Sequence, residues 1–253
     1  MHRIARLVCA SGFGAMIAVG PGFASDHGNA EWSCAVEEKL TEAAPLLPRA
    51  AKSIAGGKTL KIVALGSSST LGTGGSGAST AWPARLEIEL ERRLAGVDVT
   101  VVNKGMVRQS VPQMLARIQR DVIAQQPDLV VWEAGTSEAV RGVDVEVLTE
   151  GLLTGIDKLT QAGIEVILMD MQYARNTARL INFQPYVEAV DRAAAMRDVY
   201  VFPRYELMRE WVESEQVSFE DKTREQAVRI ADDVYACIAK NLAAVISHSL
   251  QRN

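Results

Sequence analysis

Five short apolar runs, separated by longer stretches with helical spacing, constrain the fold of this chain more than any other feature. Runs that are apolar throughout are typical of strands buried on both faces. Between the runs, apolar residues recur every three or four positions, as at Leu86, Leu90 and Leu94, which is the pattern of an amphipathic helix. The alternation predicts an α/β domain, a three-layer α/β/α sandwich around a central parallel sheet. The runs are 60–65, 97–102, 128–132, 164–169 and 199–202.

The helical stretches complete this alternation and indicate where a site should lie. Helices are expected at 82–94, 111–125, 145–162, 185–196, 207–213 and 232–249. In a doubly wound parallel sheet, ligands bind beyond the carboxyl ends of the strands. A functional site is therefore expected in the segments that follow the first four strands, which are 66–72, 103–109, 133–138 and 170–176.

The N-terminus has the pattern of an export signal. His2, Arg3 and Arg6 give a basic start, residues 7–20 are apolar, and small residues precede a cleavage point after Ala24. The apolar run is shorter than the roughly 20 residues of a bilayer span, and an uncleaved anchor or a buried helix is the alternative. We expect a periplasmic or secreted protein with no membrane span after cleavage. The predicted parts are a signal peptide at 1–24, an N-terminal helical arm at 25–57 and the α/β domain at 58–253.

Cleavage would leave two cysteines, Cys34 near the start of the mature chain and Cys237 near its end, while Cys9 leaves with the signal. An even number of cysteines in an oxidising compartment favours a disulfide. Two buried free thiols are the alternative. The disulfide would tie the arm to the last helix and stabilise the fold by roughly 3–5 kcal/mol, because it closes a long loop.

Composition and spacing argue against several kinds of site. The net charge is −4 and no run of Lys or Arg exceeds two residues, which argues against nucleic-acid binding. No Cys/His cluster has metal-ligand spacing, so no metal is expected. Residues 72–77 fit the spacing GxGxxG, but the preceding strand already ends at Leu65, and Asn103 rather than an acid follows the second strand. These departures exclude a dinucleotide cofactor and favour a mobile loop at a pocket rim.

Small and hydroxyl-bearing residues follow three successive strands: Gly-Ser-Ser-Ser-Thr at 66–70, Asn-Lys-Gly-Met-Val-Arg at 103–108 and Gly-Thr-Ser-Glu at 135–138. Together these segments resemble the first three blocks of the SGNH/GDSL hydrolases, a family of esterases, lipases and acyltransferases. The resemblance extends from about Lys61 to the last helix. It implies a flavodoxin-like topology, no cofactor, and Ser68 at the position of the nucleophile. Ser67 stands where that family has an aspartate.

Two positions depart from the family at its oxyanion hole, which the second and third blocks complete. Arg108 stands where the second block has its oxyanion glycine, and Ser137 stands where the third block has its asparagine. The resemblance places both residues at the site, together with Gly105 and Gly135. Losing one oxyanion donor costs on the order of 10²–10³ in rate.

The last family block is Asp-x-x-His, ahead of the final helix. Anchoring that block on Tyr235 places Gln226 at the aspartate and Arg229 at the histidine. A register five residues earlier gives Asp221 and Arg224, but it loses the tyrosine. Neither register supplies a histidine. The resemblance therefore implies a chain that lacks both the general base and the acid that orients it.

The histidines of the chain do not fill this gap. His2 is in the predicted signal, His27 is in the arm and His248 is close to the C-terminus. A serine hydroxyl is a weak nucleophile without an adjacent base, and loss of one triad member costs on the order of 10⁴ in rate. Arginine cannot replace the base, because its pKa exceeds about 12.

The replacements suggest a binding role. If Arg108 and Arg229 both face Ser68, they could hold a carboxylate, sulfate or phosphate. The alternative is that both arginines reach solvent or pair with acidic residues nearby.

Three functions remain open. The first is a degenerate hydrolase that binds an acyl or carbohydrate ligand, neutral or anionic, from the cell envelope. The second is an active ester hydrolase or O-acyl transferase that uses Ser68 and a non-standard base, with Asp221, Asp232 or Asp233 as candidates. The third is a structural partner in an envelope assembly. The sequence identifies neither the ligand nor the oligomeric state.

Overall fold

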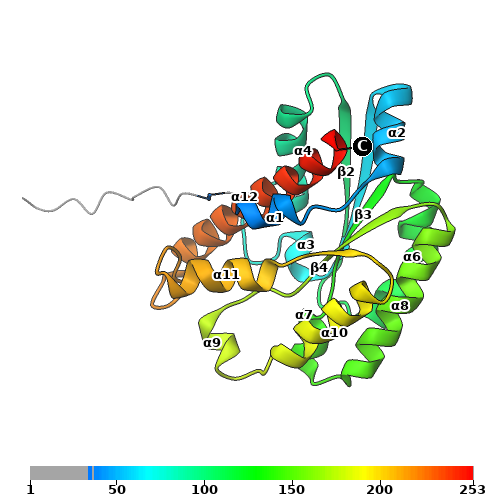
Figure 1. The fold of residues 1–253 in the computed structure, drawn as a ribbon. Helices are drawn as coiled ribbons and strands as arrows, with labels where there is room; N and C mark the ends of the chain where they lie inside the picture. Colours follow the sequence, from blue (N-terminus) through cyan, green and yellow to red (C-terminus); the bar gives the residue numbers. More distant parts are fainter. Residues whose placement is uncertain (1–33, 36, 253) are drawn as a thin grey trace, which may run out of the picture. The chain divides into compact units, whose positions relative to one another are not determined.

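The structure is a computed structural model that describes residues 34–35 and 37–252. The predicted signal peptide and the first part of the arm lie outside these residues. The core is a five-stranded sheet with the order β2-β1-β3-β4-β5 (Figure 1). Every neighbouring pair is parallel. The strands are β1 (Thr59–Gly66), β2 (Asp98–Gly105), β3 (Leu129–Glu133), β4 (Glu165–Met169) and β5 (Tyr200–Phe202).

This order is the flavodoxin-like doubly wound topology. The central strands β1, β3 and β4 are buried along most of their length, because helices cover both faces of the sheet. The predicted α/β/α sandwich with a parallel sheet is therefore confirmed. The register aligns the ends of β1 and β2, with Gly66 opposite Gly105, so the segments after these strands meet at one edge.

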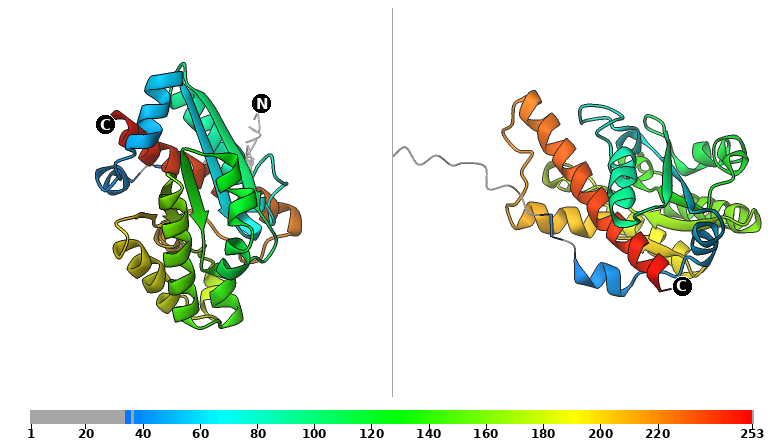
Figure 2. Two further views of the ribbon diagram at one scale, coloured as in Figure 1. Left: turned by 90° about the vertical axis from the view of Figure 1, so that its right-hand side faces the viewer. Right: turned by 90° about the horizontal axis from the view of Figure 1, so that it is seen from above.

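Two groups of helices form the outer layers, as the two views in Figure 2 show. Helices α4 and α12 pack together on one face, while α8 lies between α5 and α10 on the other. The longer helices are α2 (Pro48–Gly57), α4 (Trp82–Arg93), α8 (Val145–Gln161), α10 (Gln184–Ala195), α11 (Arg204–Glu213) and α12 (Arg224–Gln251). The shorter ones are α1 (Glu38–Glu42), α3 (Ser68–Leu71), α5 (Val111–Leu115), α6 (Ile118–Asp121), η1 (Ile123–Gln125), α7 (Thr136–Arg141) and α9 (Arg175–Ala178).

The last helix begins earlier than its apolar spacing predicts. It starts at Arg224 rather than Asp232. The cause is a capping box, in which Thr223 Oγ1 accepts from the N–H of Gln226 at 3.2 Å while Gln226 Oε1 accepts from the N–H of Thr223 at 2.9 Å. The segment expected to hold the last family block as a loop is therefore helical.

The prediction of one helix at 111–125 was also wrong, because the chain forms two short α-helices and a 3₁₀ helix there. The break at Arg117 carries a buried guanidinium. Arg117 Nη1 donates to Asp121 Oδ2 at 3.0 Å, and Nη2 donates to the carbonyl of Gly66 at 3.3 Å. The irregular backbone thus brings a cation beneath the end of β1.

The described part of the arm packs on the domain. Helix α1 contacts α12, and α2 contacts β1. Cys34 and Cys237 form a disulfide with their Cα atoms 5.2 Å apart, which confirms the predicted pairing. Beside it, the N–H of Glu37 donates to Asn241 Oδ1 at 3.3 Å. The arm is therefore fixed to the middle of α12.

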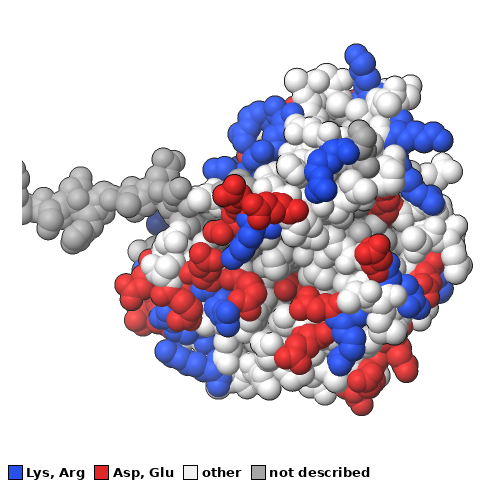
Figure 3. All heavy atoms as spheres, viewed as in Figure 1, with Lys and Arg blue, Asp and Glu red and all other residues white. Residues whose placement is uncertain are grey.

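Charged side chains of both signs lie on the surface. On the face in Figure 3, basic side chains predominate in the upper part, and acidic side chains, with some basic ones among them, predominate in the lower part. Among the described helices, none combines the length and apolar character that crossing a bilayer requires. Within residues 34–35 and 37–252, no cluster of His, Cys, Asp and Glu has an arrangement that could hold a metal ion.

Candidate functional site

The turn after β1 presents one hydroxyl outward. Gly66 ends the strand, and a β-carbon there would collide with the side chain of Thr70. Ser67, Ser69 and Thr70 are buried, whereas Ser68, the first residue of α3, is half-buried. The close packing at Gly66 therefore leaves Ser68 as the accessible serine of the turn.

A buried ionic network lies beneath this turn, and the sequence analysis missed it. Glu133, the last residue of β3, accepts from Ser67 Oγ at 3.3 Å, from Ser69 Oγ at 2.8 Å and from Thr70 Oγ1. Arg204, the first residue of α11, has its Nη1 3.1 Å from Ser69 Oγ and 3.7 Å from Glu133 Oε1. The available signal was a charged residue within two positions after each of two predicted strands, Glu133 after 128–132 and Arg204 after 199–202.

Arg108, at the position of the family's oxyanion glycine, still offers a backbone N–H. Arg108 has a left-handed backbone with φ of +56°, and its N–H donates to Ser68 Oγ at 2.9 Å. The expectation that the arginine removes this donor was wrong, because the donor belongs to the backbone. Gly105 permits the approach, since a β-carbon there would collide with the backbone N of Leu71.

The third block lies at the start of α7. Gly135 has φ of +96°, and a β-carbon there would lie 3.0 Å from Met171 Cε. Ser137 is half-buried, and its side chain makes no hydrogen bond to the described residues. Glu138 accepts from the N–H of Val111, and burial raises the pKa of this carboxyl. Glu138 thus joins the third block to α5.

The two residues expected at the positions of the family Asp and His do not meet Ser68. Gln226 belongs to the capping box of α12. Arg229 pairs with Glu225, with Nη1 and Oε1 2.9 Å apart, and its side chain is 65% exposed. Neither side chain hydrogen-bonds to Ser68 within the described residues. The hypothesis that Arg229 faces an anion pocket at Ser68 was wrong, because the early start of α12 directs that side chain to solvent.

The other candidates for a base are held elsewhere or exposed. In the alternative register, Asp221 and Arg224 are both exposed. Burial alone would raise the pKa of Asp232, but hydrogen bonds from Ser76 outweigh it and hold that pKa below its ordinary value. Burial and the neighbouring Asp232 charge raise the pKa of Asp233, which is an exposed residue.

The loop 72–77 is fastened to α12. Tyr235 Oη donates to the carbonyl of Thr73 at 2.8 Å, and Asp232 Oδ1 accepts from the N–H of Ser76 at 2.8 Å. A β-carbon on Gly75 would collide with Asp232. Gly75 therefore permits the close packing of this loop on α12, where a mobile loop was expected.

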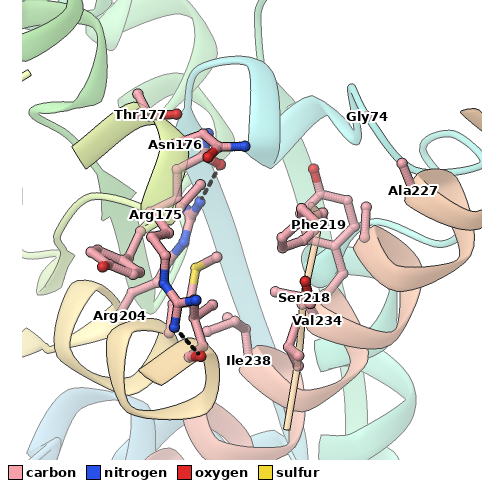
Figure 4. A pocket seen from close by; sticks show the side chains of 18 of the residues that line it. Gly74, Arg175, Asn176, Thr177, Arg204, Ser218, Phe219, Ala227, Val234 and Ile238 are labelled. Atoms are coloured by element: carbon pink, nitrogen blue, oxygen red, sulfur yellow. Dashed lines mark hydrogen bonds between the residues drawn. The ribbon is translucent and has the colours of Figure 1, made fainter. Parts of the chain in front are cut away.

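A cavity of about 690 Å³ lies beside the serine turn (Figure 4). Its walls come from the segment after β4, from α11, from residues 215–220 and from α12, with Thr73 and Gly74 at the loop. Ser68 is not among the lining residues. Arg204 links the two places, because it lines the cavity and also contacts Ser69.

Comparison with known proteins places the chain in a family. The model of the non-GDSL lipase-like family matches residues 33–252. An arylesterase from Vibrio mimicus is 30% identical over 95 residues, which are 38% of this chain and 46% of that protein. The chain therefore aligns with just under half of that curated relative.

Two solved structures share the fold. A lipase/acylhydrolase from Enterococcus faecalis has a TM-score of 0.52 and 24% identity, covering 68% of this chain and 93% of that one. A variant of an acetyl xylan esterase from Geobacillus stearothermophilus has a TM-score of 0.57 and 19% identity, covering 70% and 91%. With the match over residues 33–252, the chain belongs to the non-GDSL lipase-like family and has an SGNH/GDSL hydrolase-like fold.

Proposed function

We propose that this protein is an exported member of the family that no longer hydrolyses esters and instead binds an acyl or carbohydrate ligand of the cell envelope. The observation that carries the proposal is the environment of Ser68. Within the described residues, the only hydrogen-bond partner of its Oγ is the N–H of Arg108. A hydroxyl that accepts a hydrogen bond, and has no base to accept its own proton, is not activated for nucleophilic attack.

The histidine supply supports the same conclusion. His248 is the only histidine in the described part of the chain. It lies on α12 about 15 Å beyond Ile238, because an α-helix rises about 1.5 Å per residue. Ile238 itself still lines the cavity. A role for His248 as the base for Ser68 would need a large rearrangement of the last helix.

The test is ester hydrolysis by the purified chain from Ser25 onward. We expect the rate with a p-nitrophenyl acetate or butyrate substrate to be the same for this protein and its Ser68→Ala variant. A fluorophosphonate should leave Ser68 unlabelled, as judged by mass spectrometry. Ser79→Ala, which changes an exposed serine, is the matched control. A rate lost only in the Ser68 variant would overturn the proposal.

Export is the second part of the proposal. It is supported by the basic and apolar N-terminus and by the disulfide between Cys34 and Cys237, which suits an oxidising compartment. Expression of the full chain in a bacterial host should give a mature protein in the periplasm or medium that begins at Ser25. A protein that keeps Met1 to Ala24 in the cytoplasm would contradict it.

One observation favours an active hydrolase as the second candidate. Ser68 is accessible at the turn, and an N–H donor is in place at 2.9 Å from its Oγ. That function requires a base from outside the contacts described above. Of the three candidate aspartates, Asp232 accepts from Ser76, whereas Asp221 and Asp233 accept no hydrogen bond from the described residues. Assays on Ser68→Ala, Asp221→Asn and Asp233→Asn separate the two candidates.

A further inference from the structure

The turn that carries Ser68 offers hydrogen-bond donors that have no acceptor. Ser68 Oγ accepts from the N–H of Arg108 at 2.9 Å, but no side chain or carbonyl of the described residues accepts the proton of Ser68 itself. Ser137, half-buried near the start of α7, has a hydroxyl without a hydrogen-bond partner in the described part of the chain. Both hydroxyls are therefore free to donate to a ligand.

The carboxylates beside this turn are buried and already engaged. Glu133 is 1% exposed and accepts from three hydroxyls of the turn. Glu138 is also 1% exposed and accepts from the N–H of Val111. Neither carboxylate could turn toward a ligand at Ser68 without leaving these buried donors unpaired, which is costly. The site therefore suits a ligand group that carries acceptors alone.

Two arginines add positive charge at the same place. Arg141, the last residue of α7, donates from Nη2 to the carbonyl of Arg108 at 2.5 Å. Because the N–H of Arg108 contacts Ser68 and one residue spans at most about 3.6 Å, the guanidinium of Arg141 lies within about 9 Å of Ser68 Oγ. Arg108 and Arg141 are both exposed, and neither forms an ion pair with a described residue. Their charges are therefore available to a ligand.

Arg141 takes the part that the sequence analysis gave to Arg229. Arg229 pairs with Glu225 on the exposed side of α12, whereas Arg141 reaches the segment after β2 from α7. A guanidinium has five N–H donors and no acceptor. Arg141 uses a single nitrogen for its bond to Arg108, the one hydrogen bond of its side chain to a described residue. The other nitrogens can form paired hydrogen bonds to an oxyanion.

We propose that the serine turn binds a phosphate or sulfate group through the hydroxyls of Ser68 and Ser137 and the guanidiniums of Arg108 and Arg141. Such a group offers at least three acceptor oxygens, and so matches these donors better than a carboxylate with two oxygens. The group is either a free anion or part of a larger carbohydrate. The inference rests on the proposed binding role and names the class of its ligand. The site is distinct from the cavity in Figure 4, whose lining does not include Ser68.

The test is an NMR titration of the isotope-labelled chain from Ser25 with phosphate, at an ionic strength held constant with sodium chloride. The backbone N–H resonances of Ser68, Arg108 and Ser137 should shift and reach saturation. Arg141→Met and Ser68→Ala should each weaken phosphate binding by about tenfold or more, because hydrogen bonds to charged groups are the stronger ones. Arg229→Met, at an exposed arginine of α12, is the matched control and should leave the affinity unchanged.

Two further probes identify the source of the group. Tighter binding of glucose 6-phosphate than of phosphate would assign the group to a carbohydrate, equal affinity would assign the free anion, and glucose alone should shift none of the three resonances. No shift with phosphate, equal shifts with glucose, or an affinity unchanged in both Arg141→Met and Ser68→Ala would each overturn the anion site. Ester hydrolysis lost only in Ser68→Ala, in a protein that still binds phosphate, would overturn the proposed function and leave the anion site in place.

Discussion

Arg204 and Glu133 form an ion pair directly beneath the serine turn, although their side chains are only 2% and 1% exposed. The pair is joined to the turn through Ser69, whose Oγ lies within hydrogen-bond distance of both residues. It also forms part of the cavity wall through Arg204. The turn that carries Ser68 is thus held from below by a charge pair rather than by apolar packing alone.

Removing one member of this pair should be strongly destabilising. We expect Arg204→Met or Glu133→Gln to lower the free energy of unfolding by about 3–5 kcal/mol, because each leaves a buried charge or donor without its partner. The double variant should cost less than the sum of the two. The measurement is urea unfolding followed by circular dichroism.

The matched control for the buried pair is Glu225→Gln at the exposed pair with Arg229. It should cost no more than about 1 kcal/mol, since exposed pairs contribute little. Equal costs at the buried and exposed pairs would contradict the role assigned to Glu133 and Arg204.

A second prediction concerns the left-handed residue beside Ser68. Glycine adopts the φ of Arg108 without steric cost, whereas a β-carbon in this region costs about 1 kcal/mol. Arg108→Gly should therefore be more stable than Arg108→Ala by about 1 kcal/mol in urea unfolding. Neither variant should gain ester hydrolysis, because the N–H is already present and a base is still lacking. Turnover gained by Arg108→Gly would show that the arginine side chain, rather than a missing base, blocks catalysis.

The sheet was predictable from the sequence because strands buried on both faces are apolar throughout, and the ends of such strands are marked by glycine and hydroxyl residues. The blocks at 66–70, 103–108 and 135–138 could be located for that reason. Arg204 and Glu133 could not be paired, since their contact depends on the order of strands in the folded sheet, where β4 alone separates β3 from β5.

The predicted start of the last helix, at residue 232, was wrong for a local reason. The apolar spacing of the helix becomes clear only near Tyr235, while its first two turns are polar. The capping pair Thr223 and Gln226 was the available signal. Because the helix starts at Arg224, Arg229 lies on its exposed side and the expected anion pocket does not form.

The disulfide leads to a third prediction. It joins residues separated by 203 positions, so it restricts most of the unfolded chain. The double variant Cys34→Ser/Cys237→Ser should lower the free energy of unfolding by roughly 3–5 kcal/mol, with the effect arising chiefly in the unfolded state. Wild-type protein unfolded with and without a reductant should show the same difference. No difference between these samples would mean that the bridge does not form in solution.

Asp170 provides the last prediction, on pH dependence. This carboxyl follows β4, is fully buried and accepts from the N–H of Tyr205 at 2.7 Å. Burial raises its pKa from 3.8 to about 8, against the opposing effects of that hydrogen bond and of Arg204. Between about pH 4 and pH 8, the folded state therefore keeps a proton that the unfolded state has already lost.

The stabilising contribution of protonated Asp170 is fully present below pH 3.8 and is lost as the pH rises to about 8. Asp170→Asn keeps an acceptor for Tyr205 and removes the titration. The melting temperature of the variant should therefore exceed that of the wild type by several degrees at pH 8 and approach it near pH 4. Asp98→Asn, at an exposed aspartate, is the control. Its melting temperature should differ from that of the wild type by the same amount at pH 4 and pH 8. A constant difference between wild type and Asp170→Asn across this range would show that Asp170 is ionised in the folded protein.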